Sequence, residues 1–195
     1  MVGPLGHRDS DGTSTDFHRA VESLRAARLR PEVVLDEAPA PQRLAPYAVA
    51  MTADVLVGDE ELGSGRFVLL HDPAGHETWE GVFRVVTFVR APLEHDLAAD
   101  PMLPGVGWAW LSEALDARGA AYTAASGTVT RVSSESFGAM ADRPPTAEIE
   151  IRASWTALDL DLGRHLQAWG ELACTAAGLP PLAPGVVAMP TPRRR

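Results

Sequence analysis

One short segment, from His71 to Glu80, brings together side chains that could bind a metal ion. His71 and His76 stand on either side of a turn, and three acidic residues lie close by in the same segment: Asp72, Glu77 and Glu80. Imidazole nitrogens and carboxylate oxygens are ligands that zinc and iron(II) accept. If His71 ends one strand and His76 begins the next, a tight hairpin would bring the two rings together. The spacing matches no established metal motif, so we expect an ordinary hairpin and no cofactor. A small metal-dependent hydrolase that uses His71, His76 and Glu77 is the alternative.

A second group of titratable residues follows further along the chain, at Glu94, His95 and Asp96. A histidine between two acids can serve as a general base, because the acids raise its pKa. Acids that precede a helix also complement the helix dipole, which is the structural interpretation of the same cluster. His95 would join the first group only if both lie at the same end of the sheet.

Other signatures of catalysis are missing. The 17 basic residues are all arginines, which excludes a phosphate-loop lysine and a Schiff-base lysine. The hydroxyls around Ser126 and Ser133 lack the Gly-x-Ser-x-Gly elbow of serine hydrolases. Cys174 stands among apolar residues of an expected helix, so we predict a buried thiol without a nucleophilic role. We therefore predict no catalytic residue and favour a protein that is not an enzyme.

Charge and cysteine content limit the partners and the compartment. The formal net charge of −9 argues against binding to the phosphate backbone of nucleic acid. An arginine-bearing first helix and the arginines of 193–195 keep a nucleic-acid module as a weaker alternative. A single cysteine cannot form an internal disulfide, and no apolar run is long enough for a signal peptide or a membrane span. We expect a cytoplasmic protein.

The spacing of apolar residues predicts a leader, one folded domain and a tail, over 1–15, 16–183 and 184–195. The elements expected in the domain are helices over 16–29, 101–118 and 161–177 and strands over 47–57, 66–71, 78–89, 122–132 and 148–158. Their order is α-β-β-β-α-β-β-α, and the short connections favour antiparallel hairpins. The fold class is therefore α+β, an antiparallel sheet with helices in a two-layer sandwich.

Alternation along the strands predicts which side chains are buried. In 148–158, four apolar residues alternate with polar ones, so one face is expected in the core: Ile149, Ile151, Ala153 and Trp155. In 78–89, the side expected in the core carries Trp79, Phe83, Val85 and Val89. The opposite side carries Arg84 and Arg90, for which cross-strand ion pairing and an uncovered face that accepts a partner are both open.

Two resemblances add to this interpretation. The element order resembles the type III secretion chaperone-like fold, also used by YbjN-type proteins, and this implies partner binding and dimers. Three segments resemble an uncharacterised actinobacterial family, a domain of unknown function: Phe17–Val21, Gly81–Ala91 and Pro104–Trp108. That resemblance implies a bacterial cytosolic protein of one domain and brings no activity or site residue.

Trp108 is the remaining candidate for contact with a partner. On an ideal helix the rings of Trp108 and Trp110 point about 200° apart, which favours one buried ring and one that is exposed or packed on a loop. An exposed Trp108 would be an anchor for a partner, and burial of both rings in the core is the alternative. We predict an uncharacterised bacterial protein that acts as a non-enzymatic protein-binding or adaptor module. The partner is another protein or a second copy in a homodimer, and the contact residues are Trp108, Arg84 and Arg90.

Overall fold

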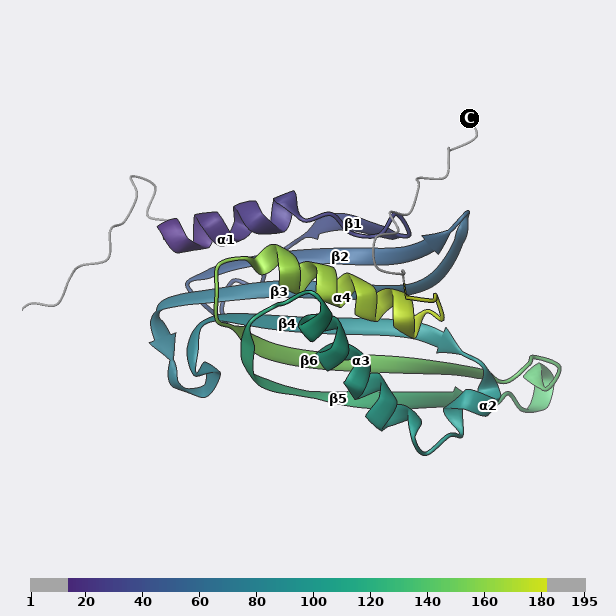
Figure 1. Ribbon diagram of the computed structural model, residues 1–195. Coiled ribbons are helices and arrows are strands. Elements are labelled where there is room, and N and C mark those ends of the chain that lie inside the picture. The colour runs from purple at the N-terminus through teal and green to yellow at the C-terminus, as the bar shows by residue number, and fades with distance from the viewer. Residues whose placement is uncertain (1–13, 182–195) are drawn as a thin grey trace, which may run out of the picture.

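The computed structural model of the chain describes residues 14–181 and shows a single sheet with helices on one side (Figure 1). The helices are α1 (Thr15–Ala26), α2 (His95–Ala98), α3 (Leu103–Ala117) and α4 (Leu162–Ala176), with 3-10 turns η1 (Glu77–Trp79) and η2 (Gly138–Met140). The strands are β1 (Val33–Ala38), β2 (Tyr47–Val57), β3 (Glu60–His76), β4 (Gly81–Leu93), β5 (Tyr122–Ser134) and β6 (Thr146–Ala157). Of the helices in this part of the chain, none has the length and hydrophobicity that crossing a bilayer requires.

The six strands form an antiparallel sheet in the order β1-β2-β3-β4-β6-β5. Strands β1 to β4 follow one another as hairpins. The chain then crosses through α3 to the far edge, where β5 turns back and β6 fills the place between β5 and β4. The expected α+β class and antiparallel sheet are confirmed, and the expected element order is met with β1 and the short α2 as additions.

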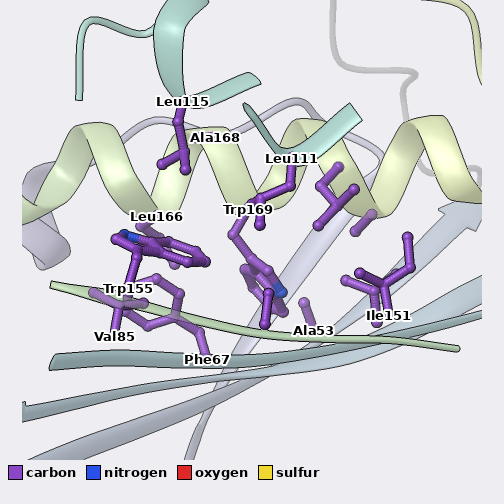
Figure 2. Packing of buried hydrophobic residues seen from close by; sticks show 14 of the residues in the cluster. Ala53, Phe67, Val85, Leu111, Leu115, Ile151, Trp155, Leu166, Ala168 and Trp169 are labelled. Carbon is purple, nitrogen blue, oxygen red and sulfur yellow. The ribbon is translucent and has the colours of Figure 1, made fainter. Parts of the chain in front are cut away.

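Three helices, α1, α3 and α4, cover one face of the sheet (Figure 1), and the main core lies between them and the strands. Figure 2 shows Trp155 from β6 and Trp169 from α4 in this layer, with Leu111 and Leu115 reaching in from α3. All four side chains are buried. The burial expected for Ile149, Ile151, Ala153 and Trp155 of β6, and for Cys174 of α4, is confirmed.

A glycine lets α4 approach the sheet closely. A Cβ at Gly65 of β3 would stand 2.7 Å from the ring of Trp169 and 2.6 Å from the carbonyl oxygen of Phe88. Real Cβ atoms do not tolerate such distances, so any side chain at this position would push α4 away from the strands. The large indole of Trp169 therefore packs directly on backbone.

The opposite side of the sheet, called here the outer face, carries a second and smaller apolar cluster. Its buried members are Ala50, Val68 and Leu70, and the connection between β1 and β2 packs against them together with Trp79. We expected Trp79 on the same side as Phe83 and Val85, and this is wrong. Trp79 belongs to η1, and Glu80 follows it in the left-handed conformation with φ 57°, so the chain changes direction before β4 begins.

The ends of the described residues bear on the expected leader and tail. Helix α1 begins at Thr15, and Ser14 already hydrogen-bonds to the sheet through His71. The remainder of the expected leader and the whole expected tail, residues 184–195, lie outside the described residues. The arginines of 193–195 lie there as well.

Candidate functional site

His71 is placed in the core. It lies on β3 on the helix-covered side, with 2% of its surface exposed. Its Nδ1 pairs with the Val82 carbonyl oxygen and its Nε2 with the Ser14 hydroxyl, both at 3.1 Å. The ring stacks on Phe83 with centroids 4.1 Å apart, and burial lowers the pKa of the imidazole. Both ring nitrogens are thus used within the protein, and His71 ties the start of α1 to the sheet.

The other histidines and acids considered for a metal site do not join His71. His76 is exposed. Its Nδ1 forms a 2.8 Å hydrogen bond with the Thr78 hydroxyl, and its ring stacks on Trp79. His95 begins α2, just beyond the end of β4, whereas His71 pairs with Phe83 near the start of that strand. Strand β4 is 13 residues long, so its two ends lie roughly 40 Å apart. Among residues 14–181 no group of three or more His, Cys, Asp or Glu side chains could hold a metal ion.

Trp108 lies on the covered side of the sheet. Like Trp110, it is half-buried and packs against the main core. Its ring stands over Gly127 of β5, where a Cβ would come within 2.8 Å of it. Of the two alternatives that the sequence left open, the structure shows the one in which both rings pack against the core.

Arg90 lies on the outer face near one end of β4 and forms an ion pair across the strands. Its Nε donates to one carboxylate oxygen of Glu148 at 2.9 Å and its Nη2 donates to the other at 2.6 Å. This is the cross-strand pairing that was one of the two interpretations of the outer arginines.

Arg84 is the unusual member of the predicted set, because it is buried and none of residues 14–181 forms an ion pair with it. Only 8% of its surface is exposed. Its guanidinium donates to the Ala124 carbonyl at 2.9 Å, and to three hydroxyls: Thr156 at 3.1 Å, Ser126 at 3.2 Å and Ser154 at 2.7 Å. Burial lowers the pKa of Arg84, and the acid whose charge opposes this shift, Glu80, is exposed.

A bulge in β5 creates the pocket for Arg84. The pairing of β5 with β6 is interrupted between Thr123 and Ser126, and Ala124 takes the left-handed conformation with φ 50°. Such a backbone costs an alanine about 1–2 kcal/mol. The bulge directs the Ala124 carbonyl to the guanidinium, so local strain is compensated by a hydrogen bond to a buried charge.

Beside Arg84, the outer face is hollowed over β3, β4, β6 and β5, with a volume of about 520 Å³. Strand register places two rows of side chains across this hollow. The first row is Val68, Val86, Ser154 and Ser126. The second row is Arg66, Phe88, Arg152 and Thr128. Arg84 belongs to the next row, beyond the lining, and donates to both serines of the first row, so it stands behind them at one end of the hollow.

The electrostatics of the hollow are one-sided. No carboxylate is among the residues that line it. Arg152 stands over the Phe88 ring at 5.0 Å and pairs with Glu150, whose carboxylate lies 2.7 Å away beyond the lining. Arg66 donates to the Pro39 carbonyl at 2.8 Å. The floor of Val68, Val86 and Phe88 is apolar, whereas the ionisable groups among the lining residues, Arg66 and Arg152, are positive.

Sequence reasoning selected Arg84 but missed its surroundings. Ser126 was considered only as a catalytic hydroxyl, and Ser154 and Arg152 only as part of the polar face of the strand over 148–158. Alternation does mark Phe88, Arg152 and Ser154 as outward-facing. Their assembly into one hollow depends on strand register, which no local pattern contains.

Fold and site together define a class: an α+β protein whose antiparallel sheet is covered by helices on one face and carries an arginine-lined hollow on the other. A family model matches residues 13–187, and the chain belongs to that family, described as "Protein of unknown function (DUF3000)". This confirms the resemblance to a domain of unknown function. Comparisons with curated proteins and with solved structures find no match. The resemblance to secretion-chaperone-like proteins and the actinobacterial origin stay predictions.

Proposed function

We propose that this protein is a non-enzymatic binding module and that its ligand lies in the hollow of the outer face. The observation that carries the proposal is the hollow itself, an apolar floor bounded by positive and hydroxyl groups on the side of the sheet opposite the helices. Its volume of about 520 Å³ falls in the range of small-molecule sites, roughly 300–1,000 Å³. The apolar floor supplies contact area, and the few polar groups supply orientation.

The side chains around the hollow support binding in preference to chemistry. Its lining has hydroxyls, but the ionisable groups among the lining residues are the guanidinium groups of Arg66 and Arg152. A guanidinium stays protonated at physiological pH, so it cannot take a proton from a hydroxyl or from water. The arrangement holds a ligand in place without a group that would activate a nucleophile.

The adaptor role expected from the sequence fits this proposal as a second property of the same protein. A stable protein interface buries about 800 Å² on each partner, more than the hollow alone supplies. A protein partner would therefore contact the outer face around the hollow as well, where Arg90 and Glu148 lie. Pull-down of a purified partner by the wild type and by Arg90→Glu tests that role separately.

A neutral apolar dye tests the proposed site directly. N-phenyl-1-naphthylamine fluoresces when it leaves water, and we expect saturable binding of one dye per protein. Val86→Trp should abolish it, because the indole would occupy the floor of the hollow. Val34→Trp is the matched control. Val34 lies on the same face of the sheet and is 36% exposed against 38% for Val86, but it stands on β1, away from the hollow.

The dye experiment has a clear negative result. Absence of saturable binding, or binding that Val86→Trp leaves unchanged in a folded protein, would overturn the proposed function.

A further inference from the structure

The strongest unexplained feature of the site is a positive charge that the described residues leave without an acidic partner. Arg84 is more than nine-tenths buried, and removing a charge from water is costly unless the charge is paired. Its partners in the structure are three hydroxyls and one carbonyl, which are neutral acceptors. Glu80 is the acid whose charge acts on Arg84, but it is exposed and forms no ion pair with the guanidinium.

The two serines that Arg84 holds face the hollow and have hydrogens left to donate. A guanidinium has donors only, so in both bonds the serine oxygen is the acceptor. The two hydroxyl oxygens lie 3.4 Å apart, and at most one of their hydrogens can be used between them. At least one O–H is therefore available to a ligand, and the charge behind it strengthens that donor.

The remainder of the hollow fits an apolar body joined to such a head. Val68, Val86 and Phe88 form a continuous floor next to the serines, because they occupy neighbouring positions on β3 and β4. On the far side Arg152 lies over Phe88 and already has Glu150 as its counter-ion. Arg66 is exposed to solvent, and its guanidinium donates to the Pro39 carbonyl. The buried positive charge without an acidic partner among the described residues therefore lies at the Arg84 end.

We infer that the ligand is an amphipathic anion: an acidic head, carboxylate or phosphate, bound by Ser126 and Ser154 in front of Arg84, on an apolar body that lies over Val86 and Phe88. This inference rests on the proposed function and specifies the chemical class of its ligand. The anion would supply the negative charge that the described residues do not provide to Arg84. An apolar ligand without a negative charge would use the floor alone.

Displacement of the bound naphthylamine dye measures how strongly the site prefers an anionic ligand to a neutral one. The competitors are 4-phenylbutyrate, its neutral counterpart 4-phenylbutanamide, and 3-phenylpropyl phosphate. We expect the better of the two acids to displace the dye at concentrations at least about tenfold lower than the amide, because hydrogen bonds to charged groups are stronger than neutral ones. Stronger displacement by the phosphate would identify a phosphate ester as the head, and stronger displacement by the carboxylate would identify a carboxylic acid.

Variants locate the preference. Arg84→Met should abolish the preference for acids over the amide, whereas Arg84→Lys should retain most of it. If Arg84→Met does not fold, Ser126→Ala combined with Ser154→Ala keeps the guanidinium and should still reduce the preference several-fold. Arg90→Met is the matched control, because Arg90 lies on the same face of the same strand and is already paired with Glu148.

The outcomes separate this inference from the proposal on which it rests. Equal displacement by acids and amide, or a preference that survives loss of Arg84 or of both serines, would overturn the inference while naphthylamine binding stands. Failure of naphthylamine to bind would overturn the proposed function itself.

Discussion

Acidification from pH 7 to pH 5 should weaken the fold through a buried histidine, His165 of α4. This side chain is fully buried, and its Nδ1 accepts a 2.9 Å hydrogen bond from the Trp155 indole N–H. Since Nδ1 is the acceptor, the neutral ring carries its hydrogen on Nε2, which has no hydrogen-bond partner among the described residues. Burial lowers the pKa of His165 to about 4, and the acids Asp159 and Asp161 offset only part of this effect.

The sign and the magnitude of this change in stability follow from linkage between protonation and folding. The unfolded chain takes up a proton at this histidine below about pH 6.5, whereas the folded protein takes it up only near pH 4. Between those values protonation favours the unfolded state, so stability is lost as the pH falls. With these two pKa values the loss from pH 7 to pH 5 is about 2 kcal/mol. Burial of His71 acts in the same direction.

Chemical denaturation followed by tryptophan fluorescence measures this loss, because Trp155 and Trp169 are buried. The comparison is between the wild type and His165→Gln, which cannot titrate and whose side-chain oxygen can still accept from Trp155. All other titrating groups, His71 included, are common to both proteins. We expect the variant to lose about 2 kcal/mol less than the wild type between the two pH values. An equal loss in both proteins would refute the assignment of the pH dependence to His165.

Two further predictions concern packing and thiol reactivity. Gly127→Ala should lower the free energy of unfolding by about 2–3 kcal/mol, because the new Cβ would stand 2.2 Å from the Arg152 carbonyl oxygen and 2.8 Å from the Trp108 ring. In Gly105→Ala the new Cβ meets no atom within 4 Å, so this variant should raise the free energy of unfolding by up to about 1 kcal/mol. Chemical denaturation of the two variants measures both changes, and an equal change in stability would contradict the packing argument. Cys174 is fully buried, and burial raises the pKa of its thiol to about 12, so a disulfide reagent should react with it only after unfolding; prompt reaction of the native protein would show that this part of α4 opens.

Elements with strong local periodicity were predicted well from the sequence. Strand β6 and helix α4 begin and end within two residues of the expected bounds. Their apolar residues repeat at the period of the element and face one large core, so local pattern and tertiary burial agree. The buried state of Cys174 follows from the same helix pattern.

Elements without such a pattern were missed or shortened. No strand was expected at β1, which begins at Val33 and continues through Asp36 and Glu37 at the edge of the sheet, where solvent tolerates acids. Strand β3 extends from Glu60 to His76, far beyond the expected 66–71, because Gly63 and Gly65 carry no side chain that signals a strand. They are tolerated there because neighbouring strands and Trp169 pack close to the backbone.

By itself the sequence determined the α+β class, the buried side of β6, and the side of β4 on which Arg84 lies, since all of these depend on residue types and short-range spacing. Only the tertiary structure decided that Arg84 is buried, which groups surround it and where a hollow forms. Ser126 and Ser154 lie 42 and 70 residues from Arg84 along the chain. They meet its guanidinium because β6 inserts between β4 and β5 and because a bulge at Ala124 shifts the register. Strand order and register arise from contacts between distant segments, which no local pattern of residues can specify.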